Sequence, residues 1–300
     1  MLDVVGPGDL VVIANTGDDI EIHGGYVSPD PDLVTFWLGD LIDERGWGLA
    51  GDTFATMDGL RAIGRDVWFN LGDRDLAIAI DRAERLRDGA RLTDAQLAIG
   101  AALGVGARVL PMSDAPVRTQ VLADGRWWSL QRYLIASGQP DVDDVRFRGA
   151  DAARATPEAL DAIAGARAIV IGPSNPIISI GPILAVPGIR EAIEASHAPR
   201  VAVSPVVGGT IVKGPSAKFI AAAGATLDGA GIAQLYAGLI DGIVCDDAPG
   251  HAPSGVRVLR ADTLMPDTAG RRRVAEATLT FADRLRDGLD AELADTREAR

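Results

Sequence analysis

Near the middle of the chain, a short apolar run is followed at once by a stiff polar turn. Residues 168–171 have the length of a buried strand, and the next five residues read Gly-Pro-Ser-Asn-Pro. In an open α/β sheet, ligands bind at the carboxyl ends of the strands, where backbone amides and helix N-termini face an anion. Gly172 permits a close backbone approach, while Ser174 and Asn175 supply hydrogen-bonding groups. The stretch 172–182 therefore predicts either part of a nucleotide or phosphate site or an ordinary strand-to-helix turn.

The composition favours an α/β fold with a mostly parallel sheet. The chain has 300 residues, of which 47% are hydrophobic and only 5% are aromatic, so Ala, Val, Ile and Leu dominate its apolar content. That mixture is typical of buried parallel strands flanked by helices, and the length suffices for one large domain or two small ones. A formal net charge of −13 argues against non-specific binding to nucleic acid. An acidic protein that handles phosphate groups needs a divalent cation or local basic residues.

The cysteine content and the apolar runs bear on the cellular compartment. Cys245 is the single cysteine, which excludes a disulfide within the chain and fits a reducing environment. No apolar run has the length needed to cross a membrane, and no signal-peptide pattern opens the sequence. We therefore expect a cytoplasmic protein without a membrane or nucleic-acid partner.

Apolar runs that end in polar turns mark the expected strands of the core. They lie at residues 10–14, 67–69, 168–171, 200–207, 242–245 and 256–259. From residue 108 onward the runs become shorter and turn-rich, and the Asp124-Gly125 pair signals a hairpin. Residues 108–150 therefore predict a small, partly antiparallel β-rich insertion, with core segments before it at 1–107 and after it at 151–300.

Two polar turns near the N-terminus carry four acidic side chains. The first turn, at residues 15–19, reads Asn-Thr-Gly-Asp-Asp, and the second, at residues 28–32, reads Ser-Pro-Asp-Pro-Asp. Carboxylates gathered at strand ends are ligands that Mg²⁺ prefers. The alternative is a solvated turn followed by a helix that Ser28 or Asp30 caps. The residues themselves leave both interpretations open.

Two further polar segments follow expected strands. Asn70 or Arg74, after the run at 67–69, predicts contact with a ligand, and an internal ion-pair network is the alternative. Lys213 and Lys218 follow a pair of glycines after the run at 200–207 and predict a second anion site. The spacing of glycine and lysine there does not match a Walker motif.

An ordered set of short stretches resembles one known family, the 2-phospho-L-lactate transferases of coenzyme F-420 biosynthesis. The order and spacing match from about residue 10 to residue 266. The stretches are NTGDD (15–19), SPDPD (28–32), RGWG (45–48), LGDRD (71–75), LPMSD (110–114), GPSNPIISIGPILAVPGIR (172–190), SPVVGG (204–209) and ADTLM (261–265).

The resemblance implies a fold and a reaction. The fold is a Rossmann-like core with helices on both faces of the sheet and a small α/β insertion, usually found as a homodimer. The reaction transfers a phospholactyl group, or a phosphoenolpyruvyl group in bacterial members, from a guanosine diphospho-donor. The acceptor is the terminal ribityl hydroxyl of 7,8-didemethyl-8-hydroxy-5-deazariboflavin, GMP is released, and Mg²⁺ is required. In that frame the helical part of residues 1–107 lies on the acceptor side.

Site residues follow from the resemblance position by position. Asp32 falls where the family contacts the deazaflavin precursor or the metal, and it is also our candidate for a catalytic base. Asp19 is implied as its companion metal ligand, and Asn70 occupies another acceptor-binding position. On the nucleotide side, the resemblance implies that Gly172, Ser174 and Asn175 hold the guanosine part of the donor.

The chain departs from the family pattern at several positions. The family opens with a strand and a Gly-Gly-x-Gly turn, whereas Met1 aligns inside the helix after that turn, so we expect the DNA upstream to encode both in frame. Ile78 and Ala79 replace a Thr-His pair, and residues 130–133 read Leu-Gln-Arg-Tyr in place of an aromatic-Gln-acid-aromatic run. The alternative function is a non-catalytic nucleotide-sugar-binding regulator of the same superfamily, similar to the gluconeogenesis-factor proteins.

Overall fold

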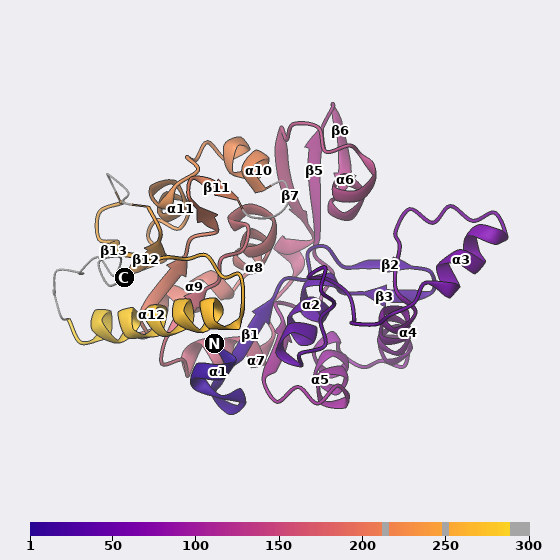
Figure 1. The fold of residues 1–300 in the computed structure, drawn as a ribbon, viewed down its shortest axis with the longest axis horizontal. Helices are drawn as coiled ribbons and strands as arrows, with labels where there is room; N and C mark the ends of the chain where they lie inside the picture. Colours follow the sequence, from indigo (N-terminus) through magenta and orange to yellow (C-terminus); the bar gives the residue numbers. More distant parts are fainter. Residues whose placement is uncertain (212–215, 248–251, 289–300) are drawn as a thin grey trace.

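The computed structural model describes residues 1–211, 216–247 and 252–288. Its principal sheet has four parallel strands, all from the C-terminal half of the chain (Figure 1). The strands are β8 (Ile169–Ile171), β9 (Arg200–Val203), β12 (Gly242–Cys245) and β13 (Arg257–Arg260). Their order across the sheet is β13-β12-β9-β8. The prediction of parallel strands from short runs of Val, Ile and Ala is confirmed.

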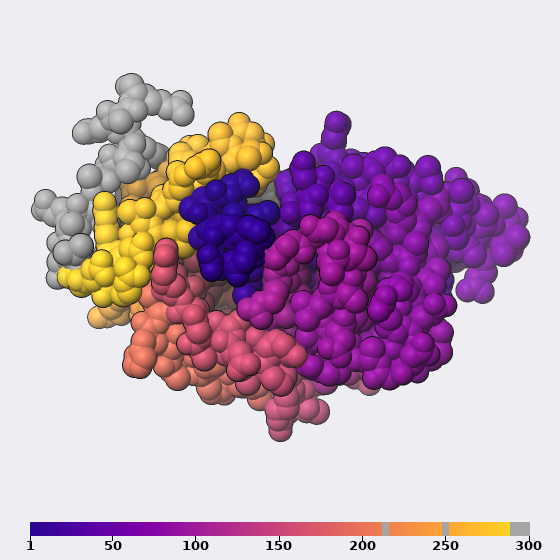
Figure 2. Space-filling model, turned by 90° about the horizontal axis from the view of Figure 1, so that it is seen from below, coloured from indigo at the N-terminus to yellow at the C-terminus, as the bar shows by residue number. Residues whose placement is uncertain are grey.

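Helices cover both faces of this sheet because side chains alternate along each strand. Ala202 and Ile243 belong to the core cluster that includes α9 (Ile189–Ala195) and α11 (Gly229–Leu235). The neighbouring residues Val201, Val203 and Val244 belong to a second cluster with α12 (Thr268–Arg286). Figure 2 shows the C-terminal helix region beside the N-terminal residues, where α1 (Leu2–Val5) contacts α12.

A second parallel pair joins two segments that are far apart in the sequence. β1 (Val11–Ala14) pairs with β4 (Arg108–Pro111) in register from Val11 opposite Arg108 to Ala14 opposite Pro111. The sequence placed residues 108–111 in the antiparallel insertion. Their parallel register with β1 instead puts them with the core strands, and Met112 after β4 packs in the same cluster as Ile171 of β8.

The segment between β1 and β4 is mainly helical. It contains the hairpin β2 (Ile20–Ile22) and β3 (Gly25–Val27), then α2 (Pro29–Leu38), α3 (Ala55–Ala62), α4 (Asp73–Arg87) and α5 (Leu92–Ala102). The expected strand at 67–69 is wrong, because this stretch has no strand pairing. Its apolar side chains instead pack with Met57 and Leu76 in a cluster between the hairpin and the helices.

The insertion forms its own antiparallel sheet. β5 (Arg118–Ala123) is central, with β6 (Arg126–Ser129) on one side and β7 (Asp144–Arg148) on the other. The predicted hairpin is confirmed, with Asp124 and Gly125 both at positive φ, as a two-residue turn between twisted strands requires. α6 (Leu130–Ala136) follows β6 and packs against β5.

The remaining described elements connect these units. They are the short helices Pro7–Asp9, Ala150–Ala152, α7 (Pro157–Ala164), the π-helical turn Pro176–Ile180, α8 (Gly181–Ala185) and α10 (Ser216–Ala222), and the two-residue strands β10 (Val206–Val207) and β11 (Thr210–Ile211). Within the described residues no single helix is long and apolar enough to cross a membrane. The segments Pro176–Ala185 and Ile189–Ala195 pass together on length and composition, but they are bent by 86°.

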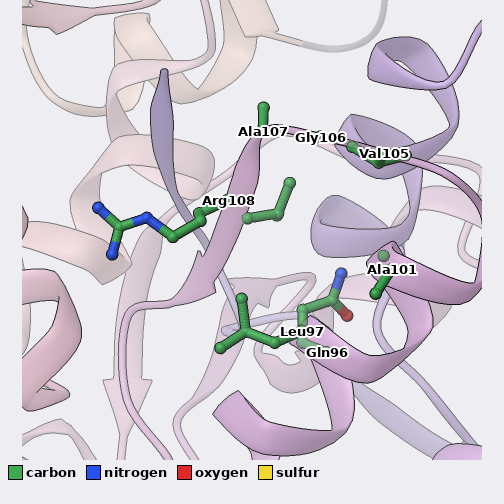
Figure 3. Close-up of a pocket in the computed structure, with 9 residues that line it drawn as sticks. Gln96, Leu97, Ala101, Val105, Gly106, Ala107 and Arg108 are labelled. Carbon is green, nitrogen blue, oxygen red and sulfur yellow. The ribbon is translucent and has the colours of Figure 1, made fainter. Parts of the chain in front are cut away.

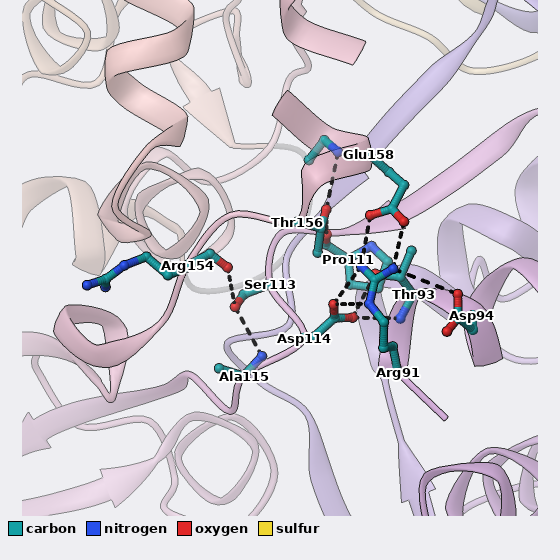
Figure 4. A network of polar contacts seen from close by, with 11 residues as sticks. Arg91, Thr93, Asp94, Pro111, Ser113, Asp114, Ala115, Arg154, Thr156 and Glu158 are labelled. Atoms are coloured by element: carbon teal, nitrogen blue, oxygen red, sulfur yellow. Dashed lines mark hydrogen bonds and ion pairs between the residues drawn. The ribbon is translucent and has the colours of Figure 1, made fainter. Parts of the chain in front are cut away.

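Arg91 ties three of these elements together at the start of α5 (Figure 4). Its guanidinium donates to both oxygens of Glu158 in α7, at 2.7 and 2.8 Å, and to Asp114 after β4, at 2.9 Å. Asp114 also accepts from the backbone and hydroxyl of Thr93, at 2.9 and 2.7 Å. The hydrogen bonds from Arg91 lower the pKa of Glu158 to about 2. The core segments before and after the insertion are thus joined by a bidentate ion pair.

We expect Arg91→Ala to lower the free energy of unfolding by about 1–2 kcal/mol at pH 7, because a half-exposed bidentate pair contributes modestly. The ion pair of Glu158 stabilises the folded protein above the usual pKa of this residue, 4.5, and this stabilisation is lost as the pH falls toward 2. The difference in free energy of unfolding between variant and wild type should therefore shrink over that range. Urea denaturation at pH 7 and pH 3 measures this. Arg190→Ala, which removes only a 3.6 Å surface pair with Glu194, is the matched control and should change little. An equal loss at both pH values would contradict the assignment to Glu158.

Candidate active site

Asn15 gathers the candidate site at the carboxyl end of β1. Its side chain is 3% exposed, and its amide nitrogen donates to Asp18 at 3.1 Å and to Asp30 at 2.9 Å. The same nitrogen lies 3.4 Å from the carbonyl oxygen of Ile178, while the amide oxygen accepts from the backbone of Gly17 at 2.6 Å. One side chain therefore brings the two acidic turns together and joins them to the turn after β8.

Asp19, which follows Asp18 in the chain, is buried, and one of its carboxylate oxygens has no hydrogen-bond partner among the described residues. Ser28 donates its hydroxyl to Asp19 Oδ1 at 2.8 Å, whereas Oδ2 is buried and has no hydrogen-bond partner among the described residues. Burial raises the pKa of Asp19 to about 7, and the Ser28 hydroxyl, the charges of Arg118 and Arg82 and the nearby Tyr26 hydroxyl counteract only part of that effect. A buried carboxylate oxygen without a partner is costly, so it points to a missing cation, proton or donor.

Asp18 and Asp30, which are partly buried, complete a group of carboxyls around the buried Asp19. Burial, together with the negative charges of Asp30 and Asp19, raises the pKa of Asp18 well above its usual value. Burial also raises the pKa of Asp30. Gln131, from α6 of the insertion, donates to Asp18 Oδ2 at 3.1 Å. We call Asp18, Asp19 and Asp30 the acidic cluster.

Asp32 is engaged by a fully buried arginine. Arg82 in α4 has 0% exposure, and it donates to Asp32 Oδ2 at 3.0 Å and through its other terminal nitrogen to Asp32 Oδ1. It also donates to the carbonyl of Tyr26 at 3.0 Å and to Gln96 at 3.1 Å. Both oxygens of Asp32 thus accept hydrogen bonds from a cation.

Arg118 forms the wall of the site that belongs to the insertion. It donates to the phenol oxygen of Tyr26 at 3.2 Å and lies 3.4 Å from the carbonyl oxygen of Thr16. The hydroxyls of Thr16 and of the neighbouring Thr119 are buried and have no hydrogen-bond partner among the described residues. A Cβ at Gly17 would lie 2.5 Å from Thr119 Oγ1, so only glycine lets this turn approach β5.

The turn after β8 reaches Asn15, which in turn holds two carboxyls of the acidic cluster. Asn175 Oδ1 accepts from the backbone of Ile177 and Ile178 at 2.8 and 3.1 Å, which caps the π-helical turn, and its Nδ2 is buried without a partner in the described structure. Ser174 is exposed, and a Cβ built on Gly172 would meet open space. The contact from Asn15 to Ile178 brings this turn to the cluster.

Asn70 and Lys218, which the sequence predicted as ligand-binding residues, have hydrogen-bond partners outside the acidic cluster. Asn70 is exposed on the loop before α4, and its side-chain oxygen accepts from Arg61 at 2.6 Å. In the adjacent motif, Asp73 accepts from the backbone of residues 55 and 56 and so caps α3. Lys218 donates to the carbonyl of Gln139 at 2.6 Å, and Lys213 lies outside the described residues.

Sequence reasoning found the acidic turns but selected only part of them. Asp19 and Asp32 were chosen, whereas Asp18 and Asp30 in the same turns were not. Arg82, Arg118 and Gln131 were missed, because a helix and an insertion distant in sequence bring them to the site. The sequence held no signal for the first two, while Gln131 belonged to a motif that the resemblance had already marked.

A cavity of about 180 Å³ lies away from the acidic cluster (Figure 3). It is lined by Gln96, Leu97 and residues of the α5–β4 connection up to Val109. Arg108 is the one titratable side chain in its lining, so the cavity offers little chemistry. The buried carboxyls, not this cavity, mark the candidate active site.

Known proteins resemble this chain over nearly its whole length. The family profile described as 2-phospho-L-lactate transferase CofD matches residues 3–275. The chain is 38% identical to the 2-phospho-L-lactate transferase of Methanosarcina mazei in an alignment of length 281, which covers 91% of this chain and 92% of the relative. It is 39% identical to the phosphoenolpyruvate transferase of Kitasatospora aureofaciens in an alignment of length 302, which covers 96% of this chain and 94% of the relative.

Solved structures agree on the fold. Protein BH3568 from Bacillus halodurans superposes with a TM-score of 0.57 at 20% identity, covering 90% of this chain and 91% of that one. Sequence identity at that level supports a conclusion about the fold alone. The family match over residues 3–275 and the identity to curated relatives, by contrast, establish the family. This chain belongs to the 2-phospho-L-lactate transferase family, the transferases of coenzyme F-420 biosynthesis.

Proposed function

We propose that this protein transfers a phospholactyl or phosphoenolpyruvyl group from a guanosine diphospho-donor to the ribityl hydroxyl of 7,8-didemethyl-8-hydroxy-5-deazariboflavin and releases GMP. The observation that carries the proposal is the family match across residues 3–275, which includes the buried acidic cluster at the end of β1. Relatives named for either three-carbon acid are 38% and 39% identical to this chain, so both donors belong to the proposal.

The acidic cluster fits a magnesium ion better than Asp32 does. Asp19 has an unpartnered buried oxygen, and the pKa values of Asp18 and Asp30 are raised, as expected where a positive charge is missing. No group of three or more His, Cys, Asp or Glu side chains in the described part of the chain forms a ready-made metal cage. Mg²⁺ is commonly held by one or two carboxylates together with substrate phosphates, so such a cage is not required. We assign the ion to Asp19 together with Asp18 or Asp30, where it would neutralise the diphosphate of the donor.

The protein's own residues then divide between the two substrates. Asn15 and Gln131 orient the carboxylates of the acidic cluster, and Arg118 places a positive charge beside it. We assign Asp32 and Asn70 to the acceptor side. Because both Asp32 oxygens already accept hydrogen bonds from the buried Arg82, we assign Asp32 to positioning the acceptor and not to removing its proton.

On the donor side, Gly172, Ser174 and Asn175 are proposed to hold the guanosine. The open space beside Gly172 and the exposure of Ser174 are compatible with a ligand there. Alignment of the donor phosphorus with the acceptor hydroxyl supplies much of the rate acceleration in such transfers. The homodimer that the resemblance implies stays a prediction.

The proposal is tested by giving the purified protein the deazaflavin precursor, each guanosine-linked donor and Mg²⁺. We expect GMP release, measured by chromatography, together with a phosphorylated deazaflavin product identified by mass. Asp19→Asn should lower kcat/KM by about 100-fold or more, since it removes a charge from the reaction centre. Asp161→Asn on the exposed side of α7 is the matched control and should keep wild-type activity. Nucleotide-sugar binding without any turnover would refute the transferase and favour the regulator.

The acidic cluster also predicts how stability varies with pH when no divalent cation is present. With a folded-state pKa of about 7 and an ordinary value of 3.8, Asp19 keeps its proton in the folded protein over a range where the unfolded chain has lost it. Stability should therefore fall as the pH rises from about 4 to 7. Asp19→Asn removes that loss. At pH 8 the variant should therefore have a higher melting temperature than the wild type, with a free energy of unfolding larger by on the order of a few kcal/mol, and at pH 4 the two proteins should be equally stable. A destabilised variant at pH 8 would contradict this account.

A further inference from the structure

Two adjacent residues of α6, the helix of the insertion, contact different parts of the protein. Gln131 is 9% exposed and donates to Asp18 of the acidic cluster at 3.1 Å. Arg132, the next residue, is exposed, and its guanidinium carbon lies 4.3 Å from the centre of the Trp68 ring. Adjacent residues point in different directions on a helix, so the position of α6 fixes both contacts at once.

Trp68 belongs to the opposite side of the site. It lies in the loop between α3 and α4, two residues before Asn70. Its ring meets the buried ring of Phe69 edge to face, with centroids 5.5 Å apart, and the carbonyl oxygen of Phe69 lies 3.1 Å from His23 Nε2 in the β2–β3 turn. Arg132 therefore contacts a ring that is fixed to the helical segment of residues 20–102.

The helix itself is fixed to the insertion and to the C-terminal part of the core. Leu130 and Tyr133 are buried with Val121 of β5, and the Tyr133 ring packs edge to face on Phe219 of α10 at 5.6 Å. Figure 1 shows α6 beside β5 and β6, apart from α3 and α4. The Arg132–Trp68 contact thus joins the insertion to the helical segment between β1 and β4, and each of these two parts has its own apolar cluster.

We propose that Arg132 and Trp68 are positioning residues, which hold the acceptor-side loop that carries Asn70 against α6 of the insertion. This inference rests on the proposed function for its effect on activity, but the bridging contact itself does not depend on it. A guanidinium over a tryptophan face is attracted by the ring electrons, and the attraction survives exposure to water. When the contact is lost, the loop that carries Asn70 is free to move away from α6, whereas the buried packing of Leu130 and Tyr133 keeps Gln131 in place.

The experiment combines hydrogen exchange with kinetics on the full-length protein. Arg132→Gln should speed amide exchange in residues 65–72 but not in 130–136, and it should raise the KM for the deazaflavin by about fivefold, with the KM for the guanosine donor unchanged. Arg132→Lys keeps a cation over the ring and should restore most of both effects. Trp68→Leu should match Arg132→Gln, and the double variant should be no worse than either single one.

A matched control exists within the insertion. Arg126 lies 3.3 Å from the Trp128 ring, both on β6, so Arg126→Gln removes the same kind of contact without breaking a bridge. It should change neither exchange nor KM. The proposal is overturned if Arg132→Gln leaves exchange in residues 65–72 as in the wild type, or if it raises the KM of donor and acceptor alike. A wild-type protein that transfers nothing would refute the proposed function, while the exchange data would still decide the bridging contact.

Discussion

The buried ion pair of Arg82 and Asp32 is the interaction on which the rest of the site depends. A guanidinium with 0% exposure is tolerated only when a carboxylate and further acceptors surround it, and Asp32, Tyr26 and Gln96 provide them. The pair fastens α4 to the first turn of α2, which also carries Asp30. It therefore sets where the second acidic turn meets the first, and removing either partner would leave an uncompensated buried charge.

Around that fixed point, the acidic cluster gathers charges of one sign in a buried place. Burial raises the pKa values of its carboxyls, and for Asp18 the charges of Asp30 and Asp19 add to that effect, so the cluster lowers the stability of the protein near neutral pH. Such an arrangement is typical of functional sites, where stability is given up for a charge pattern that a ligand completes. The hydrogen bonds from Asn15, Ser28 and Gln131 hold the cluster in place, and the positive charges of Arg118 and Arg82 compensate only part of its charge.

The sequence predicted the parts of the fold that depend on local pattern. Short apolar runs located the parallel strands, and Asp-Gly located the hairpin of the insertion. It was wrong at 67–69, because those apolar residues are buried beneath helices and not within a sheet. The parallel pairing of β4 with β1 depends on a contact across about a hundred residues, for which the sequence pattern holds no signal. The same limit applies to Arg82 and Arg118, whereas the acidic turns were visible because their composition is unusual.

The central claim is that the acidic cluster, and not Asp32, binds the divalent cation of the reaction. Anomalous diffraction from crystals grown with Mn²⁺ and a guanosine nucleotide tests it most directly, since the ion is located without any assumption about activity. We predict one strong peak next to Asp19 Oδ2, within reach of Asp18 or Asp30, with the Arg82–Asp32 pair intact. A peak bound to Asp32 with Arg82 displaced, or no peak at the cluster, would contradict the account.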